Sequence, residues 1–349
     1  MSPSDPSPAS DAAARRADAR LAWARAALGD PAATLERASM DAGFRSYWRS
    51  TGADGATRIV MDSPPDREDV RPWLHVRDLL EGGGVRVPRV LARDADAGFL
   101  LLEDLGTPTL LQVIDAGNAD ALFDAAIDQL LPLQKIAPLP GMPAYDEALL
   151  ARELRLFDEW FLGRHLGMSL DCGEMEMLDL AYRRLIDAAL AQPRVLVHRD
   201  FMPRNLMPAG DGLAVLDFQD AVVGPVAYDA LSLFKDAFLS WPPERVQGWL
   251  ARYHARAVEA GVPVPALPRF LRDADLIGVQ RHLKVLGIFA RLKHRDGKPK
   301  YIADAPRFLA YLAEALPRHP ELAPLQDFLA RRVLPAFEAQ ASGRVDASA

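Results

Sequence analysis

The sequence predicts an α+β fold with two lobes, a small β-rich N-lobe followed by a larger and mainly helical C-lobe. Short strand-like runs separated by turn residues fill the chain up to about residue 105, and long helical patterns dominate after Gly106. The length of 349 residues is about twice that of a typical domain. We therefore expect a tail and helix at 1–34, the N-lobe at 35–105 and the C-lobe at 106–349.

The elements of the N-lobe follow from local patterns. An Ala- and Arg-rich stretch that ends at Gly29 predicts a helix, and turn residues around Gly52–Gly55 predict a hairpin between two strand-like runs. Residues 1–10 have the composition of a tail. The expected elements are a helix at 11–28, strands at 44–49 and 57–62, a helix at 66–80, and strands at 85–90 and 99–102.

The C-lobe has long amphipathic patterns and one exception. Two short β-type runs, at 195–197 and 213–216, flank a polar loop in the middle of the helical region. A Pro-rich stretch at 137–143 predicts a loop between helices. Helices are expected at 109–135, 146–166, 174–191, 228–239 and 270–295.

Composition and charge disfavour several classes of function. The net charge of −7 gives no support for binding nucleic acid or membranes. Cys172 is the only cysteine, so neither an intramolecular disulfide nor a cysteine metal cluster can form. No apolar run approaches a transmembrane length, and the N-terminus lacks the apolar segment of a secretory signal. We therefore expect a cytoplasmic protein.

The polar loop between the two short β-type runs carries the motif that indicates the chemistry. Residues 198–205 have the form H-R-D-x-x-x-x-N, and Asp217 begins a D-F-x element farther along. Phosphoryl transfer needs a carboxylate beside the acceptor hydroxyl and oxygen ligands for Mg²⁺. We predict that Asp200 is the catalytic base, that Asn205 and Asp217 are metal ligands, and that ATP and Mg²⁺ are used.

The same region distinguishes between classes of kinase. A lone H-R-D would be a chance tripeptide, but the full spacing and the flanking strands favour a kinase. Protein kinases have an activation segment with a phosphorylation site after D-F-G. Residues 217–229 are short, lack Ser and Thr, and have Gln219 in place of the glycine. A small-molecule acceptor is therefore favoured over a protein substrate.

These motifs resemble those of the aminoglycoside phosphotransferase/choline kinase superfamily, over about residues 35–310. The resemblance implies a bilobal protein-kinase-like fold, in which the N-lobe binds the nucleotide and the C-lobe holds the catalytic residues and the acceptor. It places the catalytic aspartate at Asp200 and the metal ligands at Asn205 and Asp217. Asp229 matches an aspartate that braces the catalytic loop, although a helix N-cap is the other interpretation.

Within the superfamily, the chain is similar to bacterial anomeric kinases of N-acetylmuramate and N-acetylglucosamine. This likeness implies phosphorylation of the sugar C1 hydroxyl during recycling of cell-wall sugars, with the 1-phosphate feeding nucleotide-sugar synthesis. It implies a small-molecule sugar substrate, and no obligate protein partner is evident. The segments that carry the likeness are 41–49, 59–65, 216–229 and 280–291.

The N-lobe departs from the kinase pattern at one position. Kinases place a lysine on the third strand, paired with a helix Glu, but Met61 or Asp62 falls there. Arg45 or Arg49 is the nearest cation, and Glu68 is a candidate for the helix Glu, with a solvated Glu as the alternative.

Two other N-lobe segments are candidates for contact with the nucleotide. Small residues that would let a loop approach phosphate are few in 39–44. The expected hinge is 102–105, where the backbone of Glu103 and Leu105 would bind adenine.

A segment rich in basic residues, 281–295, is the second candidate for a functional site. Arg281, Lys284 and Arg291 share one face at helical spacing. That face is either a solvated surface or a binding surface for an anionic substrate such as the lactyl carboxylate of N-acetylmuramate. We predict that the C1 hydroxyl lies beside Asp200. In the second case, Lys284 or Arg291 would bind the carboxylate.

Two other functions stay open on the sequence. One is a superfamily kinase that acts on an aminoglycoside, choline or homoserine, although the basic segment disfavours a polycation. The other is a non-catalytic ATP-binding regulator, suggested by the missing lysine but disfavoured by the intact motif residues.

Overall fold

The computed structural model describes residues 8–40, 44–52, 55–210 and 212–341. By their internal packing, the residues form two compact units, Met1–Pro108 with Met207–Gln219, and Thr109–Leu206 with Asp220–Ala349. The division expected at residue 105 kept 207–219 with the C-lobe. This segment packs within the first unit instead, where the Val215 N–H donates to the Arg86 carbonyl (2.7 Å).

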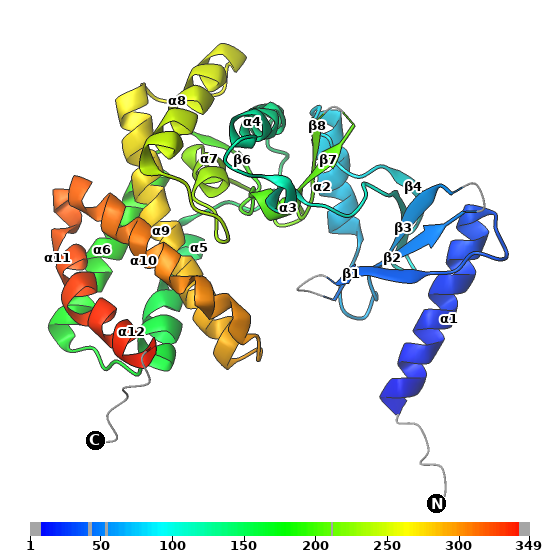
Figure 1. The fold of residues 1–349 in the computed structure, drawn as a ribbon, viewed down its shortest axis with the longest axis horizontal. Coiled ribbons are helices and arrows are strands. Elements are labelled where there is room, and N and C mark those ends of the chain that lie inside the picture. The colour runs from blue at the N-terminus through cyan, green and yellow to red at the C-terminus, as the bar shows by residue number, and fades with distance from the viewer. Residues whose placement is uncertain (1–7, 41–43, 53–54, 211, 342–349) are drawn as a thin grey trace, which may run out of the picture. The chain divides into compact units, whose positions relative to one another are not determined.

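A five-stranded antiparallel sheet forms the centre of the first unit (Figure 1). The predicted hairpin is confirmed, since β2 and β3 pair with Tyr47 opposite Met61. Part of its turn, 53–54, lies outside the described residues. In the order in which they lie, the strands are β1 (Glu36–Met40), β2 (Ser46–Thr51), β3 (Thr57–Asp62), β5 (Phe99–Glu103) and β4 (Val90–Asp94).

The helix α1 (Pro8–Leu28) covers one face of this sheet, as Figure 1 shows. Its Ala24 packs in an apolar cluster with Val60 and Leu101. Across the same face, Arg16 and Arg20 each donate to the buried carboxylate of Asp62, at 2.6 and 2.9 Å. The predicted helix up to Gly29 is therefore confirmed, and its role is to close the outer face of the sheet.

Two N-lobe boundaries differ from the prediction. The helix α2 (Arg71–Gly82) begins five residues later than expected, because Pro72 suits the first turn of a helix and no interior position. Glu68 therefore lies in the loop before the helix. The stretch 85–89 is not a strand, since Pro88 interrupts its alternating valines, and the strand begins only at Val90.

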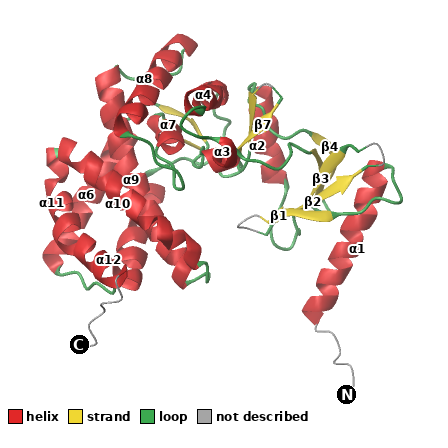
Figure 2. Cartoon of the chain, viewed as in Figure 1, coloured by secondary structure: helices red, strands yellow, loops and turns green. Residues whose placement is uncertain are grey.

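The second unit is mainly helical, as Figure 2 shows in red. The helix predicted at 109–135 is divided, because Asp115 Oδ1 accepts bonds from the Gly117 and Asn118 N–H groups and forms a turn. The helices are α3 (Leu110–Val113), α4 (Ala119–Lys135), α5 (Glu147–Leu156), α6 (Cys172–Leu190), α7 (Ala227–Phe234), α8 (Pro243–Ala260), α9 (Leu267–His294), α10 (Ala305–Ala315), α11 (Ala323–Phe328) and α12 (Leu334–Ala341), with a π-helical turn at Phe157–His165.

The long helix α9 is the central element of this unit. It packs against α5, α6, α7 and α10, and most of its side chains from Phe270 to Ala290 are buried. Gly287 permits a close approach, since a Cβ there would lie 2.3 Å from the backbone of Leu156. Within the described ranges, none of the helices combines the length and the apolar character needed to cross a membrane.

Short strands position the two motif segments. The catalytic loop follows β6 (Arg194–Val197), which pairs with β9 (Val222–Pro225). Asp217 follows a second hairpin, formed by β7 (Leu206–Ala209) and β8 (Gly212–Val215). Both β-type runs predicted in the helical half are confirmed.

Candidate active site

Backbone strain marks both motif segments. Among the described residues, two that are not glycine have a positive φ: Arg199 (75°) and Asp217 (60°). The left-handed region is unfavourable for residues with a Cβ, and such outliers cluster at functional sites. The strain therefore falls inside the two segments that the H-R-D and D-F-x patterns single out.

Asp229 braces the catalytic loop. Its Oδ2 accepts from the His198 N–H (2.6 Å) and its Oδ1 from the Arg199 N–H (3.0 Å). Burial raises the pKa of Asp229 to about 6, against the opposing effect of His198. Because α7 begins at Ala227, Asp229 lies inside the first turn, so the N-cap interpretation is wrong and the bracing interpretation is confirmed.

Asp200 and Asn205 are held together by the loop. Asn205 Nδ2 donates to the Asp200 carbonyl (2.9 Å), which leaves the Asn205 amide oxygen as an acceptor. The side chain of Asp200 is 47% exposed, and Arg281 Nη2 lies 3.5 Å from its Oδ1. Desolvation alone would raise the pKa of Asp200, but the charges of Arg281 and Lys284 outweigh it and lower the pKa. The carboxylate is therefore ionised at neutral pH.

Charged side chains from α5 and α9 form a network that contacts the catalytic loop. Arg281 donates to the Arg199 carbonyl (2.8 Å) and to the Tyr228 hydroxyl (2.9 Å). Glu153 is nearly fully buried and lies 2.9 Å from Lys284 Nζ and 2.8 Å from Arg199 Nη2. The two positive charges outweigh desolvation and lower the pKa of the Glu153 carboxyl.

This network corrects the interpretation of the basic segment. The solvated alternative is wrong for Arg281 and Lys284, because both side chains are buried. The charge of Lys284 is already matched by Glu153, which argues against its binding a substrate carboxylate. Arg291 is only partly buried, and its role stays a prediction.

Asp217 has its own neighbours in the first unit. Its Oδ1 accepts a bond from Gln219 Nε2 (2.8 Å), the residue that replaces the usual glycine. Arg45 Nη2 lies 3.8 Å from the same oxygen. Asp217 belongs to the first unit, and Asp200 and Asn205 belong to the second.

The acidic side chains of the expected hinge already accept hydrogen bonds from neighbouring residues. Glu103 accepts from Arg86 Nη2 and from the Arg89 N–H, both at 2.7 Å. Its own N–H donates to the Arg89 carbonyl (3.0 Å), and contact of its backbone with adenine stays a prediction. Leu105 is partly buried in the irregular segment that follows β5.

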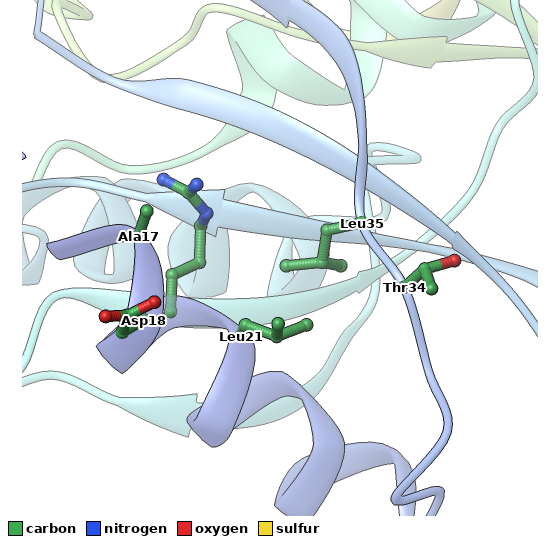
Figure 3. Close-up of a pocket in the computed structure, with 6 residues that line it drawn as sticks. Ala17, Asp18, Leu21, Thr34 and Leu35 are labelled. Carbon is green, nitrogen blue, oxygen red and sulfur yellow. The ribbon is translucent and has the colours of Figure 1, made fainter. Parts of the chain in front are cut away.

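A separate hollow lies on the first unit. It has a volume of about 290 Å³ and is bounded by α1 and by Thr34 and Leu35, as Figure 3 shows. None of the motif residues lines it. We therefore assign it no part in the predicted site.

Sequence reasoning missed Glu153 and Tyr228 entirely. Glu153 stands in an ordinary helical pattern, and its partners Arg199 and Lys284 are distant in the chain. Nothing in the local sequence indicates a buried carboxylate there.

A match to a known family shows where the chain belongs. The model of the phosphotransferase enzyme family APH matches residues 34–261, which include all the motif residues described above. The chain belongs to this phosphotransferase family. The resemblance inferred from the motifs is therefore confirmed, and the phosphotransferase is a kinase, an enzyme class that takes its phosphoryl group from ATP.

This phosphotransferase has relatives in bacteria. It is 54% identical, over 86% of its chain and 89% of the relative, to the N-acetylmuramate/N-acetylglucosamine kinase of Pseudomonas aeruginosa. The protein with the same name from Neisseria meningitidis is 45% identical over 86% of this chain and 90% of the relative.

Solved structures confirm the fold. A choline kinase from Streptococcus pneumoniae superposes with a TM-score of 0.58 at 15% identity, covering 85% of this chain and 99% of that one. An ADP-bound aminoglycoside phosphotransferase gives 0.57 at 17% identity, covering 84% and 97%. The phosphotransferase therefore has the predicted α+β, protein-kinase-like fold.

Proposed function

We propose that this phosphotransferase transfers the terminal phosphoryl group of ATP to the C1 hydroxyl of N-acetylmuramate and N-acetylglucosamine. The observation that carries the proposal is the 45–54% identity, over most of the chain, to relatives named for these two sugars. The sugar 1-phosphates would feed nucleotide-sugar synthesis during recycling of cell-wall sugars in the cytoplasm.

Asp200 is the proposed base. An ionised carboxylate with a lowered pKa is a weak base, and it suits an acceptor that gives up its proton readily. The C1 hydroxyl of a reducing sugar is a hemiacetal and is more acidic than an ordinary alcohol. As the hydroxyl oxygen forms its bond to the γ-phosphorus, the bond from that phosphorus to the β–γ bridging oxygen breaks, ADP leaves, and the hydroxyl proton passes to Asp200.

The residues behind Asp200 keep it ionised and oriented. Arg281 donates to the Arg199 carbonyl next to Asp200 and also faces the carboxylate. Asp229 holds two successive N–H groups of the same loop. Phosphoryl transfer depends mainly on positioning and charge, so a rigid loop suits this reaction.

Asn205 and Asp217 are the proposed metal ligands. They offer an amide oxygen and a carboxylate, the hard oxygen donors that Mg²⁺ prefers, so the donor set fits. Bound Mg²⁺ would neutralise charge on the phosphates of ATP. The Glu103 carbonyl and the Leu105 N–H are proposed to bind the adenine.

The test is product analysis with matched variants. Asp200→Asn should lower turnover by about 10²- to 10⁴-fold while ATP still binds. Asp217→Ala should weaken Mg·ATP binding as well, and the exposed Asp187→Asn is the control. Near-normal turnover of Asp200→Asn would show that the base is misassigned.

The position of the phosphate is tested separately. The product should carry phosphate on C1, and the 1-O-methyl glycosides should be inert. Phosphorylation of a methyl glycoside at C6, or turnover of kanamycin, choline or homoserine in place of both sugars, would overturn the proposed acceptor.

A further inference from the structure

The first unit needs a cation for the phosphates and has no lysine to provide one. The sequence contains no lysine before Lys135, and none in Met207–Gln219. At the two positions where the third-strand lysine would fall, Met61 is fully buried and Asp62 is bound by α1. Among side chains that carry a permanent positive charge, this unit can therefore offer only arginines to a nucleotide.

Arg45 has acidic neighbours of the kind that kinases give to that lysine. In protein kinases, the lysine pairs with a Glu of a helix while a separate Asp binds the metal, whereas Glu68 lies in the loop before α2. Arg45 directly precedes β2, is 6% exposed, and has its Nε 3.4 Å from Glu68 Oε1. Its Nη2 lies 3.8 Å from Oδ1 of Asp217, the proposed metal ligand.

The alternation of side chains along β2 indicates on which face of the sheet Arg45 lies. Tyr47 is opposite Met61 in the β2–β3 pairing, and Ser46 is opposite Asp62. Side chains alternate along a strand, so Arg45 extends the series of Tyr47 and points away from the face that α1 covers. It is therefore on the same side as Met61, one of the two residues at which the missing lysine would fall, and not on the side of Asp62.

The other arginine considered, Arg49, is committed elsewhere. Its guanidinium donates to both carboxylate oxygens of Asp104, at 2.5 and 3.0 Å, and to the Gly106 carbonyl (2.9 Å). These bonds hold the segment after β5 and raise the pKa of Arg49. Arg49 thus has a structural role at the hinge.

The geometry points to Arg45 as the residue that binds the phosphates of ATP, with Glu68 as the carboxylate that positions it. This inference rests on the proposed use of ATP. A guanidinium presents a fork of N–H donors that matches phosphate oxygens in pairs. The contact with Asp217, at 3.8 Å, is longer than a hydrogen bond and can be exchanged for a phosphate.

The experiment compares binding of ATP and adenosine by calorimetry, so that it does not depend on the sugar. Arg45→Gln should weaken ATP about 10- to 100-fold, the range for a lost charge-assisted contact. Adenosine, which has no phosphates, should bind within about twofold of wild type. Arg45→Lys should recover part of the ATP affinity, and the exposed Arg93→Gln is the control for a lost charge in the same unit.

The outcomes separate this inference from the proposed function. ATP affinity of Arg45→Gln equal to wild type, or equal losses for ATP and adenosine, would overturn the role of Arg45. If Arg45→Gln does not fold, Glu68→Gln is the deciding variant. It should weaken the affinity for ATP at least several-fold and leave the affinity for adenosine unchanged. An unchanged affinity for ATP would overturn the inference. A wild-type enzyme that binds ATP but phosphorylates neither sugar would overturn the proposed acceptor alone.

Discussion

Glu153→Gln tests the buried charge network that supports the catalytic loop. Glu153 is 5% exposed and neutralises two cations, Lys284 at 2.9 Å and Arg199 at 2.8 Å. Glutamine keeps the shape but removes the negative charge, so the buried Lys284 and the partly buried Arg199 lose this carboxylate. Breaking a buried ion pair by removing one partner costs about 3–5 kcal/mol.

This cost should be visible in thermal unfolding. In a domain of this size each kcal/mol changes Tm by about 2–4 °C, so the expected decrease is roughly 6–20 °C. The control is Glu176→Gln on the exposed surface of α6, which should change stability by less than about 0.5 kcal/mol. The measurement is circular dichroism against temperature, because it follows the helical unit directly.

A second variant and a pH series sharpen the test. Lys284→Met added to Glu153→Gln removes one of the unpaired cations, so the double variant should be more stable than the sum of the single effects predicts. The folded pKa of Glu153 lies below its ordinary value, so its contribution is complete above about pH 4.3 and is lost as the pH falls below that. A Tm of Glu153→Gln within about 2 °C of wild type would refute the role of this network.

Three further changes have defined outcomes. Asp229→Asn should lower both turnover and Tm, because the new NH₂ group must face one of the two N–H donors that the carboxylate binds. Burial raises the pKa of Asp229 to about 6, so the stability of the wild type should fall as the pH rises from about 4 to 6. The variant should lack this dependence on pH. Gly287→Ala should destabilise by roughly 1–3 kcal/mol in urea unfolding, because its Cβ would overlap the backbone of Leu156, and an unchanged midpoint would contradict the packing of α9 on α5. Asp62→Asn should make α1 more sensitive to limited proteolysis, because Arg16 and Arg20 lose their shared carboxylate, and an unchanged cleavage pattern would show that apolar packing alone holds the helix.

Much of this protein could be predicted from the sequence because the signals were local. The spacing between Asp200, Asn205 and Asp217 lies within one loop and one hairpin, and local patterning predicted the strands on either side. The hairpin of β2 and β3 and the end of α1 at Gly29 also depend only on neighbouring residues. The errors in the predicted element boundaries were local too, because Pro72 determines where α2 begins and Pro88 where the next strand begins.

The tertiary structure alone decided which charges meet. Helical spacing placed Arg281 and Lys284 on one face, but it did not show that the face packs against a buried Glu153. The same holds in the first unit, where either Arg45 or Arg49 could replace a lysine until Asp104 was found to occupy Arg49. The periodicity of a helix or strand determines the face on which each of its side chains lies. The partner of that side chain depends on which distant segment of the chain packs against this face.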